Sequence, residues 1–249
     1  MTKERIDKIL VERGLADSRT KAQALVMSGV VLANEQRVEK SSEMFTPETA
    51  VRLKGVSEEN RFASRGGLKL EKALQEFHID AKNKICLDIG ASTGGFTDCL
   101  LQNGARTVYA VDVGTNQLIW RLRTDERVKV FENVNARNLS TDDFGGVKFD
   151  LIVMDVSFIS ATKIFPAAAR LLDEKGVFIC LIKPQFEVGR GEVGKGGIVR
   201  EAEKREKVVE KLNNAAFELN LSNKGVIESP ITGADGNVEF LAQYVLKNL

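Results

Sequence analysis

The chain has 249 residues, of which 43% are hydrophobic, and its 36 basic and 35 acidic residues give a formal net charge of +1. This length and composition suit a globular protein with one large domain, or with one medium domain and a small one. The even charge balance excludes an overall basic signature, so any surface that binds nucleic acid has to be local.

Membrane and secretion signals are not expected from this sequence. No run approaches the roughly 18 uncharged apolar residues needed to cross a bilayer, and residues 1–13 interleave basic side chains with acidic ones. The three cysteines, Cys86, Cys99 and Cys180, lie far apart in apolar surroundings, which predicts neither a disulfide framework nor a cysteine-based metal site. We therefore expect a cytoplasmic protein without a metal ion or a membrane partner.

The first 55 residues have the pattern of a small α+β unit. Apolar residues at helical spacing predict two short helices between residues 5 and 27, and Asp17 or Ser18 can cap the second of them. Runs typical of strands follow at 30–33 and 51–53, with a turn at Asn34-Glu35. We place the first domain at 1–55 and a polar linker at 56–63.

The rest of the chain, 64–249, alternates apolar strands with amphipathic helices. Strand-like runs at 85–90, 107–113, 128–131, 150–156 and 177–183 are separated by helical patterns at 94–102, 116–123 and 162–172. This alternation predicts an α/β fold in which helices cover both faces of a mostly parallel sheet. A charged helix at 201–219 and two closing strands at 224–229 and 238–246 follow, and their short connection predicts one antiparallel strand at the end of the sheet.

A glycine-rich segment joins the first of these strands to the helix that follows. It contains Gly90, Gly94 and Gly95, and glycines at this place let the backbone approach a ligand at the carboxyl edge of the sheet. Asp112, at the end of the next strand, can accept hydrogen bonds from a ribose diol, and Asp88 can hold an ammonium group. A nucleotide-like ligand is expected, although the G-x-G-x-x-G fingerprint is not met, and a tight turn without a ligand is the alternative.

Two further loops carry groups that bind ligands less specifically. Residues 133–137, which include Asn135, can reach the adenine end of a cofactor or form a plain polar loop. Residues 189–196 nearly match a phosphate loop but have Gly196 where a hydroxyl is needed, so we reject the binding of a nucleoside triphosphate. This loop is better interpreted as a mobile lid that clamps RNA, or as a simple flexible loop.

Other residue types add little. His78 is the sole histidine, which leaves histidine catalysis or metal ligation almost unsupported. The aromatic side chains Trp120, Phe131, Phe158 and Phe186 are more typical of a core than of a base-stacking surface, and Phe186 is the one to test for stacking.

Four motifs in the larger domain make the chain resemble a known family. The D-x-G-x-S-x-G-G-F run from Asp88 is followed by Val111-Asp112, then by Asp155-Val156-Ser157-Phe158 and by Lys183-Pro184-Gln185-Phe186. Together they resemble the FtsJ-type ribose 2′-O-methyltransferases, which implies a Rossmann-like class I methyltransferase sheet and S-adenosylmethionine as the cofactor.

The N-terminal unit resembles an S4 RNA-binding domain. The similarity rests on Arg5-Ile6-Asp7, Leu10, Ser18-Arg19, Ala22 and residues 29–34, with Glu35 where a glycine is usual. Together with the Ser64-Arg65-Gly66-Gly67 run, it makes the chain similar, nearly end to end, to the TlyA or hemolysin A family of ribosomal RNA cytidine 2′-O-methyltransferases. The partner implied is ribosomal RNA or a ribosomal subunit, and the oligomeric state is left open.

The resemblance also implies a catalytic set. Matching the family's Lys-Asp-Lys-Glu residues motif by motif gives Lys69, Asp155, Lys183 and Glu239. A ribose hydroxyl is a very weak acid, so we expect Lys183 to be the base, the carboxylates to orient it and Lys69 to stabilise the developing alkoxide. For any one lysine in isolation, a solvated charge or a surface ion pair is the alternative.

The expected ligand contacts are these. For the cofactor they are Asp88, Gly90, Ala91, Ser92, Gly94, Gly95, Phe96, Asp112, Asn135 and Asp155. For RNA they are Arg5, Lys8, Arg13, Ser18, Arg19, Lys21, Arg65, Arg190 and Lys195.

Three other functions stay open at this point. A non-catalytic RNA-binding or ribosome-assembly factor can retain the cofactor fold. A methyltransferase acting on a small molecule would leave the N-terminal unit without a purpose. A pore-forming hemolysin needs a signal, a membrane span or a long amphipathic segment, and we find none in the sequence.

Overall fold

The computed structural model describes residues 3–16, 18–54, 61–189, 191–233 and 235–247. Contacts divide the chain into two compact units, Met1–Arg61 and Phe62–Leu249. Residues 56–60 of the predicted linker, 56–63, lie outside the described residues. Of its remainder, Phe62 is only 5% exposed and packs in the core of the second unit, and Asp98 accepts a hydrogen bond of 2.7 Å from the Ala63 N–H.

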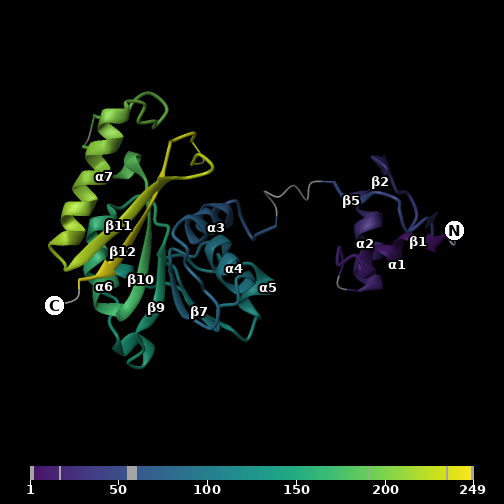
Figure 1. The fold of residues 1–249 in the computed structure, drawn as a ribbon, viewed down its shortest axis with the longest axis horizontal. Helices are drawn as coiled ribbons and strands as arrows, with labels where there is room; N and C mark the ends of the chain where they lie inside the picture. The colour runs from purple at the N-terminus through teal and green to yellow at the C-terminus, as the bar shows by residue number, and fades with distance from the viewer. Residues whose placement is uncertain (1–2, 17, 55–60, 190, 234, 248–249) are drawn as a thin grey trace. The chain divides into compact units, whose positions relative to one another are not determined.

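The described residues of the first unit form two helices and two small sheets (Figure 1). Its sheets have the strand orders β1-β4 and β3-β2-β5. Ile6, Leu10, Ala22 and Val31 are fully buried in its core. The elements are β1 (Glu4–Arg5), α1 (Ile6–Glu12), α2 (Arg19–Met27), β2 (Val31–Ala33), β3 (Gln36–Arg37), β4 (Met44–Phe45) and β5 (Val51–Leu53).

The two predicted details of this unit can be followed in the structure. Ser18 caps α2, because its Oγ accepts a hydrogen bond of 3.3 Å from the Lys21 N–H, whereas Asp17 lies outside the described residues. In the turn, Asn34 and Glu35 both have positive φ, and Glu35 forms an ion pair with Arg52. The acid that replaces the usual glycine is therefore held by a neighbouring strand.

The second unit is a seven-stranded sheet with the order β11-β12-β10-β9-β6-β7-β8 (Figure 1). The strands from β10 to β8 pair in parallel, whereas β12 is antiparallel to both β10 and β11. The predicted fold class and the single antiparallel strand are confirmed. β12 lies inside the sheet, however, because β11 pairs with its outer side.

The bounds of the strands and helices in this unit are as follows. The strands are β6 (Ile85–Ile89), β7 (Thr107–Val111), β8 (Val128–Phe131), β9 (Phe149–Met154), β10 (Leu172–Ile182), β11 (Leu221–Glu228) and β12 (Phe240–Leu246). The helices are α3 (Gly66–Glu76), α4 (Gly95–Gln102), α5 (Trp120–Arg123), α6 (Phe165–Leu171) and α7 (Ala202–Phe217). The described residues also form short 3-10 turns: η2 (Ala136–Asn138), η3 (Asp142–Phe144), η4 (Ala161–Lys163) and η5 (Pro184–Phe186).

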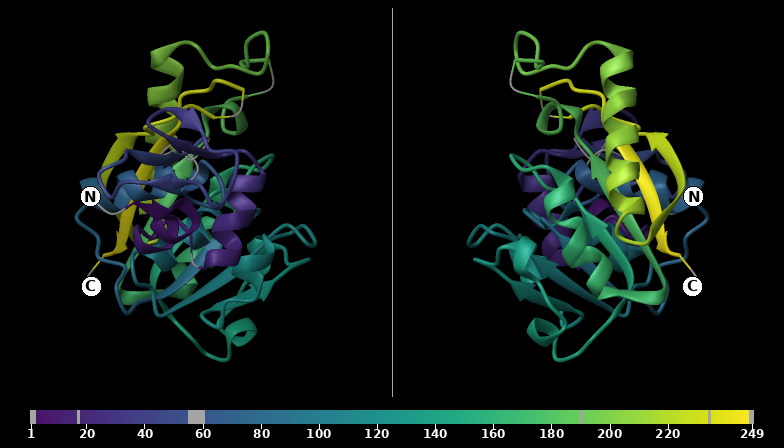
Figure 2. Two further views of the ribbon diagram at one scale, coloured as in Figure 1. Left: turned by 90° about the vertical axis from the view of Figure 1, so that its right-hand side faces the viewer. Right: turned by 90° about the vertical axis from the view of Figure 1, so that its left-hand side faces the viewer.

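Helices cover both faces of the sheet, as predicted. Side chains of successive strand residues point to opposite faces, and in β6 Leu87 and Ile89 belong to one core cluster while Cys86 belongs to the other. The first cluster includes residues of α6 and α7, and the second includes residues of α3, α4 and α5. Figure 2 shows α7 beside the β11–β12 hairpin in both of its views.

One predicted helix is mostly a loop. The pattern at 116–123 gives only the four-residue α5, Trp120–Arg123. Asn116 has a φ of 54°, and the Gln117 N–H is bound by the Glu132 carboxylate at 3.2 Å, so the preceding residues are held in a non-helical path. Two predicted core aromatics are also wrong: Phe158 is 92% exposed and Trp120 is 75% exposed.

The glycine at the end of β6 is required by packing between two strand ends. Gly90 has a φ of 86°, and a Cβ there would lie 2.2 Å from the Asp155 carbonyl oxygen. We expect Gly90→Ala to lower the free energy of unfolding by roughly 3 kcal/mol, because left-handed strain adds to a clash with backbone. Gly145→Ala is the control, since Gly145 also has positive φ but nothing within 4 Å, and it should cost about 1 kcal/mol. Urea unfolding of both variants measures the difference, and equal losses would contradict the packing explanation.

Candidate active site

The predicted site residues gather at one edge of the sheet. The glycine-rich loop follows β6. Asp112 is the first residue after β7, Asp155 is the first after β9, and Lys183 is the first after β10. These are carboxyl ends of parallel strands, which meet at one edge. β12 runs the other way and begins there, with Phe240 opposite Ile182 of β10, so Glu239 is brought to the same edge.

Two cavities open at this edge and share part of their walls. The first, of about 360 Å³, is lined by all four members of the proposed catalytic set, Lys69, Asp155, Lys183 and Glu239. The second, of about 660 Å³, is lined among others by Asp112 and Asn135. The residues common to both are Gly90, Ser92, Asp155, Ser157 and Phe158.

The four charged residues form two lysine–carboxylate pairs. Lys69 Nζ lies 2.5 Å from Glu239 Oε2, and Lys183 Nζ lies 2.5 Å from Asp155 Oδ1. Lys183 Nζ also donates a hydrogen bond of 2.9 Å to Ser157 Oγ. The side chains of the first pair are 10% and 2% exposed, and ion pairs buried to this extent give little net stability because desolvation offsets the attraction. Their position in one cavity therefore points to a chemical use.

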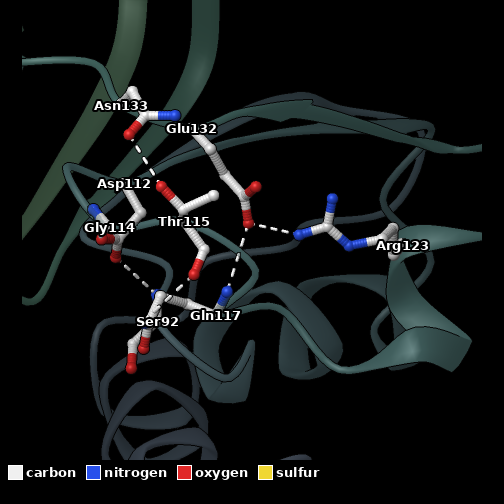
Figure 3. A network of polar contacts seen from close by, with 8 residues as sticks. All are labelled: Ser92, Asp112, Gly114, Thr115, Gln117, Arg123, Glu132 and Asn133. Carbon is white, nitrogen blue, oxygen red and sulfur yellow. Dashed lines mark hydrogen bonds and ion pairs between the residues drawn. The ribbon is translucent and has the colours of Figure 1, made fainter.

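Asp112 joins the loop after β6 to the loop after β7 (Figure 3). Its Oδ2 accepts a hydrogen bond of 2.8 Å from the Ser92 N–H, and its Oδ1 accepts one of 2.7 Å from the Gly114 N–H. A carboxylate oxygen can accept two hydrogen bonds, so each retains capacity for a ribose hydroxyl. Asn133 stiffens the neighbouring segment by accepting a hydrogen bond of 2.7 Å from the Thr115 hydroxyl.

Asp88 is not placed as predicted. Its side chain is fully buried, lines neither cavity, and points to the α4 side of the sheet, where Oδ2 accepts a hydrogen bond of 2.6 Å from Thr97 Oγ1. Oδ1 has no hydrogen-bond partner among the described residues. The alternation of β6 turns the carboxylate under the loop, so it supports the loop from behind instead of facing a ligand.

The glycines of the loop also have a reason other than the predicted one. A Cβ at Gly94 would lie 2.3 Å from Leu122 Cδ1, and one at Gly95 would lie 2.2 Å from Ser64 Oγ. These atoms belong to the protein itself. The close approaches thus serve internal packing, and Gly94 lines neither cavity while Gly95 lines the first.

The other predicted ligand residues are divided between cavity walls and surfaces. Ala91, Phe96 and Arg65 line the first cavity. Lys195 is exposed, and Arg190 lies outside the described residues.

In the first unit, the predicted RNA contacts are engaged with the unit itself. Arg5 and Arg19 both bind the buried Asp7 carboxylate, at 2.9 and 3.1 Å. Lys8 pairs with two glutamates, and Arg13 donates to backbone carbonyl groups. Ser18 caps α2, and Lys21 is exposed. The two arginines keep more than 40% of their side chains exposed, so they can still reach a partner.

Sequence reasoning missed Ser157, Phe158 and Gln185 as wall residues of the first cavity. Phe158 has a φ of 64°, unusual for a bulky residue, and its ring lies 5.1 Å from that of Phe186. Its position directly after Asp155-Val156-Ser157 was the available signal, since a residue that follows a site motif in a loop is exposed more often than an interior aromatic.

Comparisons with known proteins agree with this geometry. Residues 62–244 match the FtsJ-like methyltransferase family, and residues 4–51 match the S4 domain. The chain belongs to the FtsJ-like methyltransferase family.

Relatives of this methyltransferase cover both domains. The protein named 16S/23S rRNA (cytidine-2′-O)-methyltransferase TlyA of Mycobacterium tuberculosis is 43% identical over 95% of this chain and 87% of its own length. Hemolysin A of Brachyspira hyodysenteriae is 43% identical over 97% of this chain and 100% of its own. The family resemblance to TlyA and hemolysin A is confirmed.

Solved structures agree as well. A candidate hemolysin from Streptococcus thermophilus, 47% identical, has a TM-score of 0.74 over 100% of this chain and 90% of its own. A Burkholderia thailandensis methyltransferase with S-adenosylhomocysteine bound is only 17% identical and has a TM-score of 0.52 over 73% of this chain and 79% of its own, a likeness of fold alone.

The residues present fit S-adenosylmethionine. The cofactor is long and has a ribose in its middle, and the two adjacent cavities share wall residues, with the Asp112 carboxylate in the second cavity and the lysine–carboxylate pairs in the first. Asp112 would hold the ribose hydroxyls, and the loop from Gly90 to Ser92, which lies at the junction, would face the methionine portion.

The buried position of Asp88 predicts a pH dependence of stability. The pKa of Asp88 is raised from its ordinary 3.8 to about 7, chiefly by burial and also by the nearby Asp155 charge, against the Thr97 hydrogen bond, which lowers it. The native state therefore binds this proton more tightly than the unfolded chain, and the stability it contributes is complete below about pH 4 and is lost as the pH rises through 7. In Asp88→Asn the free energy of unfolding should fall less than in the wild type between pH 5 and pH 8, measured by urea unfolding. Parallel pH profiles of the two proteins would show that Asp88 does not titrate in this range.

Asp112 predicts a specific loss of cofactor affinity. Asp112→Asn keeps the shape but removes acceptor capacity, so the Kd for S-adenosylhomocysteine should rise at least about ten-fold, the worth of one hydrogen bond to a charged group. Asp125→Asn is the matched control, because Asp125 pairs with Arg127 outside both cavities. Titration calorimetry compares the three proteins, and an unchanged Kd in Asp112→Asn would exclude the ribose role.

Proposed function

We propose that this protein transfers a methyl group from S-adenosylmethionine to the 2′-hydroxyl of a cytidine ribose in ribosomal RNA. The observation that carries the proposal is the presence in one cavity of two lysine–carboxylate pairs, one buried and one partly buried. This cavity shares wall residues with a second cavity that is lined by the Asp112 carboxylate. The M. tuberculosis relative, named for the same reaction on 16S and 23S RNA, supports the choice of RNA and cytidine.

The chain's own residues supply proton transfer and orientation. S-adenosylmethionine supplies an electrophilic methyl group on a sulfonium when it is bound. Lys183 would be the base that accepts the proton of the 2′-hydroxyl as that oxygen takes the methyl group from the sulfonium sulfur. Asp155 and Ser157 fix its Nζ, and Lys69, held by Glu239, stabilises the negative charge that develops on the oxygen.

Phe158 and the first unit supply recognition in this proposal. Phe158 is exposed at the junction of both cavities and lies against Phe186, so its ring offers a face on which an unstacked base can pack. The S4 domain contributes Arg5 and Arg19 for RNA phosphates. The alternative is a non-catalytic RNA-binding or ribosome-assembly factor, in which Lys69 and Lys183 would have no chemical role.

Two of the similar proteins are named hemolysin, so we also considered a function in membranes. Within the part of the chain that the structure describes, no helix is long and apolar enough to cross a bilayer. The site geometry gives no argument for a pore, so we keep the enzyme as the proposal.

The function is tested by methyl transfer from labelled S-adenosylmethionine to ribosomal RNA and subunits of a strain that lacks this gene. Wild type should label ribose 2′-oxygens, whereas Lys183→Ala and Lys69→Ala should lower kcat about 100-fold or more, because each removes a group that acts in the transition state. Lys72→Ala is the control, since Lys72 lies on the same helix as Lys69 in an exposed pair with Glu76. No label on any RNA or subunit, despite cofactor binding, would overturn the proposal in favour of a binding factor or another substrate.

A further inference from the structure

Two loops beside the first cavity are fastened to each other at three points. The loop 155–161 follows β9, and the η5 turn with Glu187 follows β10, its parallel neighbour. At one end Lys183 binds Asp155 and Ser157. In the middle, the ring centroids of Phe158 and Phe186 lie 5.1 Å apart.

Glu187 makes the third contact. Its Oε2 accepts a hydrogen bond of 2.7 Å from the Ser160 hydroxyl, and its Oε1 accepts one of 2.6 Å from the Ala161 N–H. Its side chain is only 2% exposed and lines neither cavity. Both carboxylate oxygens thus bind the end of the 155–161 loop.

The charge of Glu187 is compensated from the other side. Lys211 of α7 lies 3.8 Å from its Oε2 and donates a hydrogen bond of 2.8 Å to its backbone carbonyl. A buried carboxylate is costly unless it is paired and fully hydrogen-bonded, and here its bonds all serve to join the two loops and α7. We therefore ask which part of the 155–161 loop this buried carboxylate holds in place.

What it fixes is the strained Phe158. A bulky residue in the left-handed region is strained, and Phe158, at 92% exposure, gains almost nothing from burial. Backbone strain of this kind persists only where the flanking residues are held. Ser157 is held on one side by Lys183, and Ser160 and Ala161 are held on the other side by Glu187.

We propose that Glu187 is a positioning residue that holds Phe158 at the mouth of the cavity and thereby orients the target nucleotide toward Lys183. This inference rests on the proposed function, in which Phe158 packs on the base. It assigns the glutamate of the Lys183-Pro184-Gln185-Phe186-Glu187 run a role in RNA binding and turnover, separate from cofactor binding.

A double-mutant cycle tests whether Glu187 acts through Phe158. Glu187→Ala and Phe158→Ala should each lower kcat/KM for RNA at least ten-fold, while the double variant should fall no more than about three-fold below the worse single variant. The Kd for S-adenosylhomocysteine should stay within two-fold of wild type in all three. Losses that multiply, a Phe158→Ala variant with full activity, or a cofactor Kd that rises with the loss of activity would each overturn the proposal.

Two matched variants separate positioning from folding. Glu187→Gln should recover activity to within about three-fold of wild type, because its amide oxygen can accept from the Ala161 N–H and its NH₂ can donate to Ser160. Glu203→Ala, which removes an exposed glutamate paired with Lys207, should behave as wild type. A Glu187→Gln variant as impaired as Glu187→Ala would overturn the proposal.

Hydrogen exchange gives a readout that does not need activity. In Glu187→Ala, amides of residues 157–161 should exchange at least ten-fold faster, with no change in β9 or β10. If wild type methylates no RNA, the proposed function fails, yet the exchange result still decides whether Glu187 holds this loop: unchanged exchange would overturn the positioning role by itself.

Discussion

The antiparallel pairing of β12 with β10 is the constraint on which the candidate active site depends. The other strands that end at the active edge deliver residues at their carboxyl ends, so a residue at the start of a parallel strand would lie at the opposite edge of the sheet. Reversal of β12 brings Glu239 beside the end of β10, opposite the Ile182–Lys183 step. Glu239 then holds Lys69 of α3, and two lysine–carboxylate pairs can share one cavity.

The second constraint is the close approach of the chain at the ends of the neighbouring parallel strands β6 and β9. Gly90 allows the Asp155 carbonyl to approach where any Cβ would collide, and the Asp155 N–H in turn binds the Ile89 carbonyl. This contact sets the Asp155 carboxylate against Lys183, at the junction between the two cavities. The glycine-rich loop is therefore as much a packing device as a ligand loop, which explains why its glycines collide with protein atoms when extended by a Cβ.

The loops at the active edge are held by carboxylates that bind backbone amides. Asp112 binds the amides of Ser92 and Gly114, Asp98 binds that of Ala63, and Glu187 binds that of Ala161. Each joins segments distant in sequence, and each replaces the hydrogen bonds that regular secondary structure would have given. These carboxylates therefore hold loop segments beside the cavities where helices and strands do not supply backbone hydrogen bonds.

The sequence by itself determined the parallel sheet, because alternating apolar runs and amphipathic stretches can be buried in few other ways. The resemblance to the FtsJ-type family implied the set Lys69, Asp155, Lys183 and Glu239, and the edge rule for parallel strands placed Asp155 and Lys183 side by side. Only the tertiary structure decided the direction of Asp88, because the face that a strand residue occupies depends on register and pleat. It alone decided the exposure of Phe158 and the shortness of α5, because these follow from hydrogen bonds to Lys183, Glu187 and Glu132 that join residues distant in sequence. The local pattern of apolar residues indicates which side of a segment can be buried. The backbone path at the site depends on side-chain contacts between residues that are distant in sequence.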